Sequence, residues 1–167
     1  MVNKIKKEES RVVFKESHNL LSNEFDSSTR SLVLNTLILD CCLNDFSPDQ
    51  IGQFSFNAKG GDHFVWIARM NKHKGVENAI AAAERLGAML KIAGRIDPTQ
   101  EAYFNEVIRP HLNDRIEYVG ELTPGQLSDF YGPAKALLYP IEWEEPFGLV
   151  VAEAMACGTP VIAYRRG

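Results

Sequence analysis

From residue 63 onward the chain alternates short apolar segments with segments of helical periodicity, and this alternation restricts its possible folds more than any other feature. The apolar segments contain β-branched and aromatic residues and recur at roughly 20–25-residue intervals, which is typical of strands joined through helices. We expect strands at 63–69, 89–93, 116–119, 136–139 and 160–164. The segments between them predict helices at 75–86, 98–112, 124–131 and 148–156.

Strands that are joined through helices run parallel to one another in a single sheet. Right-handed crossovers then place helices on both faces of that sheet. The sequence therefore predicts an α/β fold with a Rossmann-like parallel sheet. We expect an incomplete sheet of this type, because the last strand ends close to Gly167 with no closing helix after it.

The first part of the chain has a different pattern. Residues 1–57 hold one apolar segment at 32–43 between stretches rich in Ser, Asn and Asp, and they contain no clear repeat. We expect an irregular or partly helical leader there, to which no function can be assigned. The predicted division is therefore an unassigned leader at 1–57 and a Rossmann-like unit at 58–167.

Composition excludes several classes of protein. Hydrophobic residues at 45% and charged residues at 24% are ordinary for a soluble globular domain. The net charge of −4 argues against a nucleic-acid partner, which would favour a basic excess. No apolar stretch reaches the roughly 20 residues of a membrane-spanning helix, and the amino-terminal residues lack the apolar core of a signal peptide. With three cysteines and no zinc-type spacing, we expect a cytoplasmic protein without a structural metal.

The exit of the first expected strand carries a cluster of basic side chains. In a doubly wound sheet, ligands bind at the carboxyl ends of the strands. Arg69, Lys72, His73 and Lys74 follow the first strand and directly precede a helix, whose N-terminus attracts anions. On the residues alone, a phosphate site and a set of solvated loop charges both stay open. The absence of G-x-G-x-x-G and Walker A patterns disfavours a dinucleotide fingerprint or a P-loop.

The exit of the fourth expected strand holds two carboxylates with a distinctive spacing. Glu145 precedes a helix and Glu153 lies two turns into it, about 12 Å apart if the segment is helical throughout. That separation is too large for one acid–base pair, but it suits two carboxylates that bind hydroxyls at opposite ends of an extended ligand. The N–H groups of Gly148, Leu149 and Val150 would be unpaired at the helix start. Because the neighbours of Glu153 are apolar, we favour a functional role for it over that of a surface carboxylate.

Four motifs occur in order along this part of the chain. They are Ala68-Arg69-Met70-x-x-x-Lys74-Gly75, then Lys91-Ile92-Ala93-Gly94, then Ile116-x-Tyr118-Val119-Gly120, and finally the run from Glu145 to Ile162, in which seven residues separate Glu145 from Glu153. With these motifs, residues 62–167 resemble the C-terminal, donor-binding half of retaining glycosyltransferases of the GT-B fold, group 1 (GT4). The Glu-x7-Glu pattern is the hallmark of that family.

The resemblance implies a role for each matching residue. Arg69 and Lys74 would neutralise the diphosphate of the donor as the glycosidic bond breaks. Glu153 would bind the ribose hydroxyls, and Glu145 would bind the hydroxyls of the transferred sugar. The other implied donor-binding residues are Gly94, Gly120, Leu122, Gly148, Leu149 and Val150. No metal and no cofactor are implied, because fixed positive charge can stabilise the departing diphosphate.

The resemblance also implies an activity and its partners. The expected reaction is a retaining transfer of a sugar from a UDP-, GDP- or ADP-sugar to an acceptor that the sequence leaves open. Family members have an N-terminal acceptor-binding half, for which residues 1–57 are too short. We therefore expect the chain alone to be inactive, with the other half supplied elsewhere. The alternatives are a non-catalytic nucleotide-sugar-binding fragment or module and a GT-B-fold sugar-nucleotide epimerase, which predicts the Glu-x7-Glu run less well.

Overall fold

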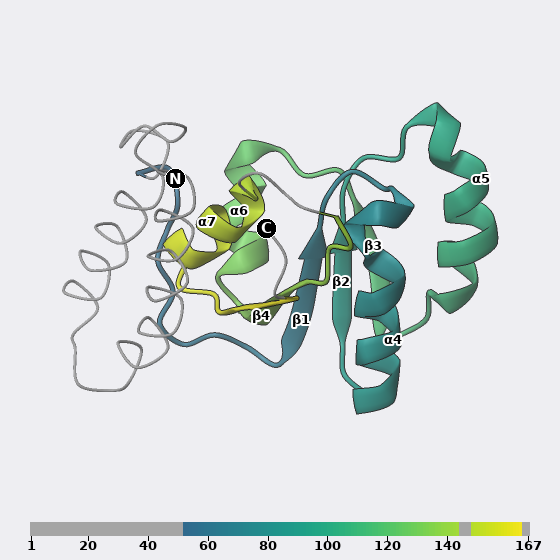
Figure 1. Cartoon of the computed structure of the whole chain (residues 1–167). Helices are drawn as coiled ribbons and strands as arrows, with labels where there is room; N and C mark the ends of the chain where they lie inside the picture. The colour runs from purple at the N-terminus through teal and green to yellow at the C-terminus, as the bar shows by residue number, and fades with distance from the viewer. Residues whose placement is uncertain (1–51, 144–147, 165–167) are drawn as a thin grey trace, which may run out of the picture.

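The computed structural model describes residues 52–143 and 148–164. Within them a five-stranded sheet has the order β3-β2-β1-β4-β5, and every neighbouring pair is parallel (Figure 1). Its strands are β1 (His63–Ile67), β2 (Leu90–Ala93), β3 (Ile116–Gly120), β4 (Ala134–Tyr139) and β5 (Val161–Ala163). The predicted parallel sheet is confirmed, and β4 begins two residues earlier than expected.

The helices lie where the periodicity predicts them, and one of them is irregular. The regular helices are α4 (Val76–Leu86), α6 (Leu127–Tyr131) and α7 (Leu149–Ala156), and short turns η1 (Lys72–Lys74) and η5 (Pro124–Gln126) precede α4 and α6. The helix predicted at 98–112 is confirmed as a continuous helical segment at 98–111. It consists of short pieces with different hydrogen-bond patterns: η2 (Pro98–Gln100), α5 (Glu101–Tyr103), the π-helical η3 (Phe104–Ile108) and η4 (Arg109–His111). Pro110 lacks an N–H donor and crowds the preceding turn, so the α-helical hydrogen-bond pattern cannot continue through it.

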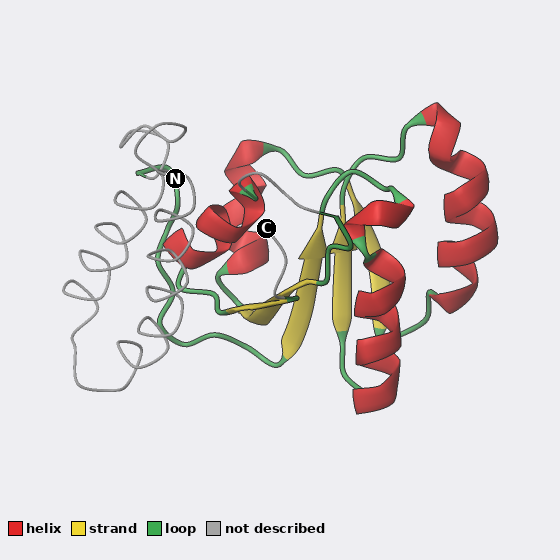
Figure 2. Ribbon diagram, viewed as in Figure 1, coloured by secondary structure: helices red, strands yellow, loops and turns green. Residues whose placement is uncertain are grey.

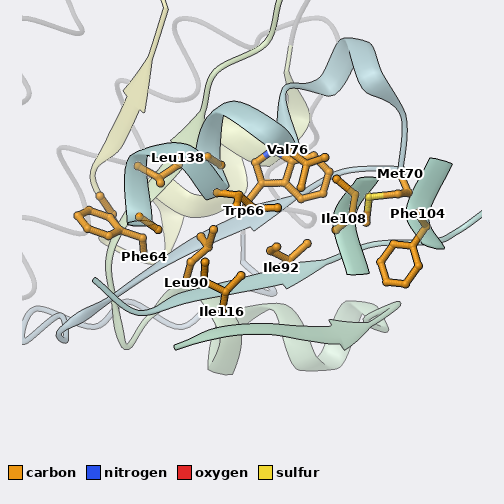
Figure 3. Close-up of a cluster of buried hydrophobic side chains, with 14 residues drawn as sticks. Phe64, Trp66, Met70, Val76, Leu90, Ile92, Phe104, Ile108, Ile116 and Leu138 are labelled. Atoms are coloured by element: carbon orange, nitrogen blue, oxygen red, sulfur yellow. The ribbon is translucent and has the colours of Figure 1, made fainter. Parts of the chain in front are cut away.

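One face of the sheet is covered by α4 and by the helical segment at 98–111. Phe64 and Trp66 point to this face, because alternate residues of a strand face the same side. On α4 the buried residues Val76, Ala79, Ile80 and Ala83 follow the spacing of one helical stripe. Figure 3 shows how the side chains of this first cluster fill the layer between strands and helices.

The other face is covered by α6 and α7. Here Val65 and Leu137 from the strands pack with Tyr131 of α6 and Ala154 of α7 in a second cluster. Figure 2 shows α4 and α5 on one side of the strands and α6 and α7 on the other. The expectation of helices on both faces is confirmed.

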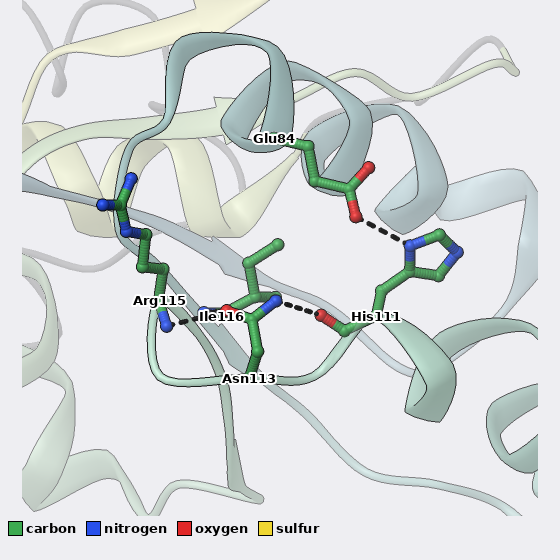
Figure 4. A network of polar contacts seen from close by, with 5 residues as sticks. All are labelled: Glu84, His111, Asn113, Arg115 and Ile116. Atoms are coloured by element: carbon green, nitrogen blue, oxygen red, sulfur yellow. Dashed lines mark hydrogen bonds and ion pairs between the residues drawn. The ribbon is translucent and has the colours of Figure 1, made fainter.

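The turn that leads into β3 is fixed by a polar network at the amino ends of the strands (Figure 4). Glu84 Oε1 of α4 lies 2.8 Å from His111 Nδ1, and Asn113 Nδ2 donates to the His111 carbonyl at 2.9 Å. The Arg115 N–H donates to Asn113 Oδ1 at 2.8 Å. This network ties α4 to the start of β3 at the edge opposite the strand exits.

The described residues before position 58 pack against α6 and α7. The Asn57 N–H donates to the Cys157 carbonyl at 2.9 Å, and the Ser55 N–H donates to Ser128 Oγ at 3.0 Å. Phe54 contacts the second cluster. The boundary at residue 57 stays a prediction, and the irregular or partly helical structure expected for residues 1–51 lies outside the described residues.

Candidate functional site

The topology of the sheet marks one position for ligand binding. The chain leaves β1 towards α4 on one face and leaves β4 towards α7 on the other face. Since β1 and β4 are neighbours in the sheet, their carboxyl ends form the point at which the strand order reverses. Open α/β sheets bind ligands at this switch point. The two exits, 68–75 and 140–148, are the segments in which the sequence places its candidate residues.

The two exits are joined to each other. The Glu142 N–H donates to the His73 carbonyl at 3.2 Å, and Asn78 Nδ2 of α4 donates to Glu142 Oε1 at 2.8 Å. Gly75 approaches so closely that a Cβ atom there would lie 2.0 Å from the Pro140 carbonyl oxygen. Gly75 also has a φ of 73°, in the left-handed region that favours glycine. The exits of β1 and β4 therefore form one connected surface.

The basic loop after β1 is anchored by the core. The indole N–H of Trp66, a buried residue of β1, donates to the Lys74 carbonyl at 3.2 Å. Lys74 Nζ lies 4.7 Å from the centroid of the Trp143 ring, a cation–π contact that reaches across to the β4 exit. Arg69 is exposed on the same loop. The structure thus brings Lys74 to the switch point from the β1 side and places Arg69 at the beginning of the loop.

Helix α7 begins at the exit of β4. Gly148, its N-cap, has a φ of 75° and is packed so that a Cβ would lie 2.9 Å from Tyr139 Oη. Leu149 is about half exposed, at 48%, and Val150 packs against the second cluster. Glu145, to which the resemblance assigns sugar binding, lies outside the described residues.

Glu153 is a partly buried carboxylate on α7. The Tyr131 hydroxyl donates a hydrogen bond to Glu153 Oε2 at 2.9 Å. Burial raises the pKa of Glu153 above its ordinary 4.5, and the hydrogen bond from Tyr131 opposes that rise. Burial, together with the charge of Glu153, raises the pKa of Tyr131 well above 10. The tyrosine therefore stays protonated and serves as a permanent donor to the carboxylate.

Sequence reasoning missed Tyr131. In the sequence it is one more apolar-type residue at the end of an expected helix, and nothing in the local spacing relates it to a carboxylate 22 positions further on. Only the packing of α6 beside α7 brings the two side chains together.

The remaining predicted residues lie at the exits of β2 and β3. Gly94 is buried, its N–H donates to the Gly120 carbonyl at 2.8 Å, and a Cβ there would lie 1.7 Å from the Ala68 carbonyl oxygen. The Tyr118 hydroxyl donates to the Gly94 carbonyl at 2.7 Å. Leu122 packs against the second cluster, which also contains Tyr131. Gly94 and Gly120 thus hold the backbones of neighbouring strand exits together, and Leu122 lies on the face of α6 and α7.

The described parts of the chain show neither a metal-type cluster nor a membrane-spanning helix. Among residues 52–143 and 148–164, no three His, Cys, Asp or Glu side chains are grouped as a metal site would require. No helix in these ranges is both long enough and apolar enough to cross a membrane. The loop after β1 carries positive charges that can bind an anion. The Glu153 carboxylate, oriented by Tyr131, can accept hydrogen bonds from hydroxyl groups.

Several known proteins with similar sequences are glycosyltransferases. The family described as "Glycosyl transferases group 1" matches residues 49–167. A glycogen synthase of Mycobacterium tuberculosis is 36% identical over 114 residues, which cover 65% of this chain and 27% of the relative. A 2-deoxystreptamine N-acetyl-D-glucosaminyltransferase of Streptomyces fradiae is 30% identical over 162 residues, which cover 84% of this chain and 38% of the relative.

A solved structure shares the fold. The sucrose-phosphate synthase of Thermosynechococcus elongatus superposes with a TM-score of 0.61 at 29% identity, over 70% of this chain and 33% of that one. The chain spans between about a quarter and two fifths of the length of these proteins. Its parallel sheet is the Rossmann-like sheet of GT-B glycosyltransferases. Since the family match covers well over half of the residues, the chain belongs to the group 1 glycosyltransferases.

Proposed function

We propose that this chain binds a nucleotide sugar at the carboxyl ends of β1 and β4, as the donor half of a retaining glycosyltransferase. Two observations carry the proposal. A cationic loop is joined to the β4 exit at the switch point, and the helix that follows this exit holds a carboxylate bonded to Tyr131. A nucleotide sugar has matching groups, because its diphosphate is anionic and its ribose and sugar rings carry hydroxyls.

In this proposal Arg69 and Lys74 bind the donor diphosphate. As the glycosidic bond breaks, negative charge accumulates on the leaving diphosphate, and positive side chains fixed beforehand stabilise that charge. Charge-assisted hydrogen bonds of this kind contribute roughly 1.5–3 kcal/mol each. Lys74 would leave the face of Trp143 to meet the phosphate. No metal has a part in the proposed site.

The hydroxyl groups of the donor are assigned to the two carboxylates. Glu153 accepts from the ribose, and Glu145 accepts from the transferred sugar. Backbone groups of Gly148, Leu149 and Val150 meet the sugar and phosphate. The exits of β2 and β3, with Gly94, Gly120 and Leu122, line the nucleoside.

Transfer itself requires an acceptor, which in this proposal is bound by a second unit of the enzyme. The acceptor hydroxyl attacks the anomeric carbon on the face from which the diphosphate departs, so the configuration is retained. The donor base is uracil, guanine or adenine. We propose that residues 52–164 bind the donor without turning it over.

Titration calorimetry with UDP, GDP, ADP and their glucose conjugates tests this proposal. One nucleoside diphosphate should bind, Glu153→Ala should weaken both the diphosphate and its conjugate, and Glu145→Ala should remove only the gain that the sugar brings. Glu117→Ala changes an exposed carboxylate of β3 and is the matched control. Equal effects of the two site variants on both ligands would contradict the assignment.

A turnover assay completes the test. The chain is incubated with the donor that binds, and released nucleoside diphosphate is measured with and without simple sugar acceptors. Binding without turnover supports a donor-binding unit that needs a partner half. Turnover by the chain alone would overturn the proposed need for a second unit, and absence of binding to every donor would overturn the proposed function.

A further inference from the structure

Glu153 has one hydrogen-bond partner among the described side chains, and that partner is Tyr131. A carboxylate has two oxygens with about four acceptor positions, of which the tyrosine occupies one. No other side chain in the described ranges is bonded to the remaining positions, and the orientation of the carboxylate is fixed through Oε2. A glutamate on a helix would otherwise sample several side-chain rotamers.

Tyr131 is itself held rigidly. Its side chain is fully buried in the second cluster, and its ring packs edge-on against Phe130 at a centroid distance of 5.7 Å. Its carbonyl accepts a hydrogen bond of 2.7 Å from the Thr159 hydroxyl. Thr159 follows α7 and is buried as well, so both ends of the Tyr131–Glu153 pair belong to one packed unit. Because the Tyr131 hydroxyl already has little freedom as a hydrogen-bond donor, little conformational entropy is lost when the pair binds a ligand.

We propose that Tyr131 is a positioning residue, which orients the Glu153 carboxylate so that it can accept hydrogen bonds from the 2′- and 3′-hydroxyls of the nucleoside ribose. This inference rests on the proposed function. It adds a residue that the sequence did not indicate, and it makes Tyr131 a determinant of selectivity for ribose over deoxygenated sugars. A site built to hydrogen-bond hydroxyls discriminates strongly against an analogue that lacks them.

The pair also gives the site a defined pH response. Burial raises the pKa of Glu153, and the Tyr131 hydrogen bond lowers it, so losing the hydroxyl raises it further. Among the described residues, the other titratable groups near the pair are Cys157 at the end of α7, whose own pKa is raised to about 11 by burial, and Tyr139 of β4. A protonated Glu153 has lost its negative charge and accepts hydrogen bonds more weakly. Tyr131→Phe should therefore move the acidic limit of nucleotide binding to higher pH.

The test compares Tyr131→Phe with Tyr103→Phe in the full chain. Tyr103 belongs to α5 and packs against the first cluster, on the opposite face of the sheet, so it is a matched hydroxyl deletion remote from Glu153. Calorimetry measures the affinity for the ribonucleoside diphosphate that binds best and for its 2′,3′-dideoxy analogue. We expect Tyr131→Phe to weaken the ribonucleotide about tenfold and to leave the dideoxy analogue unchanged. The Tyr103 hydroxyl lies near Glu77 and Glu142 and away from Glu153, so Tyr103→Phe should leave the ratio of the two affinities unchanged.

A double-mutant cycle separates positioning from a general structural effect. If Tyr131 acts through the carboxylate, Tyr131→Phe should have no further effect on ribonucleotide affinity in the Glu153→Ala background. Thr159→Val, which removes the hydroxyl that holds the Tyr131 carbonyl, is the second variant and should shift ribonucleotide affinity in the same direction. Urea unfolding checks that each variant folds.

The outcomes separate the two claims. If the wild-type chain binds no nucleoside diphosphate, the proposed function fails and this inference falls with it. If the chain binds a ribonucleotide but Tyr131→Phe leaves the ratio of ribose to dideoxy affinity and the acidic limit unchanged, the inference alone is overturned. An additive effect of the two substitutions in the cycle would likewise overturn it.

Discussion

A methyl group on Gly75 should push apart the two loops of the candidate site. The Gly75 Cα faces the Pro140 carbonyl so closely that an alanine Cβ would lie 2.0 Å from the oxygen. The Pro140 backbone would have to move by roughly 1.4 Å to restore ordinary van der Waals contact. That movement would strain the bond between the Glu142 N–H and the His73 carbonyl.

Gly87 gives this substitution a matched control. Gly75 and Gly87 flank the same helix, α4, with φ and ψ values of 73° and 26° at Gly75 and 59° and 28° at Gly87. A Cβ on Gly87 meets only the end of the flexible Arg115 side chain, at 3.2 Å. The two alanine variants therefore share the left-handed backbone penalty, about 1–2 kcal/mol, and differ in the steric conflict. Overpacking adds about 1–3 kcal/mol, so Gly75→Ala should destabilise the fold by about 2–5 kcal/mol.

Urea unfolding measures the free energy of unfolding of both variants, with an unchanged slope as evidence that the same transition is followed. We expect Gly75→Ala to lose at least about 1 kcal/mol more than Gly87→Ala. Nucleoside diphosphate binding should also fall for Gly75→Ala, because a misplacement of about 1 Å at a site is enough to impair it. Equal losses of stability in the two variants, together with equal nucleotide affinity, would refute the reasoning.

Two further predictions concern stability. Burial holds the pKa of His63 below its ordinary 6.5, with Lys91 acting in the same direction and Asp62 opposing it. The unfolded chain therefore binds the proton first, and the free energy of unfolding should fall as the pH is lowered through 6.5 towards the folded pKa. Urea unfolding at several pH values should show that His63→Phe removes this part of the pH dependence, and parallel curves for the two proteins would contradict it. Leu137→Ala, at a fully buried position of β4, should reduce the free energy of unfolding by about 2–5 kcal/mol. Leu86→Ala, at a side chain that is 70% exposed, should change the same quantity by less than about 0.5 kcal/mol, and similar losses at the two positions would contradict the assignment of the core.

The sheet could be predicted from the sequence because its signals are local. Each strand is a short apolar run, and the buried residues of α4 recur at helical spacing. The local sequence pattern is therefore enough to predict which residues face the core. Parallel direction and helices on both faces then follow from the order of strands and helices. Periodicity also predicted the helical segment at 98–111, but not its division into pieces of different hydrogen-bond pattern. Pro110, near the end of that segment, is a local signal against a continuing α-helix.

The residues of the candidate site could also be predicted only in part from the sequence. Arg69, Lys74 and Glu153 could be proposed from their places after strands and in α7, since strand exits carry ligand sites in such sheets. The hydrogen bonds that hold the site together could not be predicted from the sequence. The hydrogen bond of Tyr131 to Glu153 joins residues 22 positions apart, and the bond between Asn78 and Glu142 joins residues 64 positions apart. No periodicity spans such separations.

The amino-acid sequence by itself determined the strand-and-helix order, the Rossmann-like class and the family, because these depend on short-range patterns and on motifs that keep their spacing. Only the tertiary structure decided that the β1 and β4 exits interlock at Gly75 and Pro140 and that a buried tyrosine orients Glu153. The physical reason is that these contacts arise where separate elements pack together. Their distances are set by the sheet and its two layers of helices, and not by the order of residues along any one element.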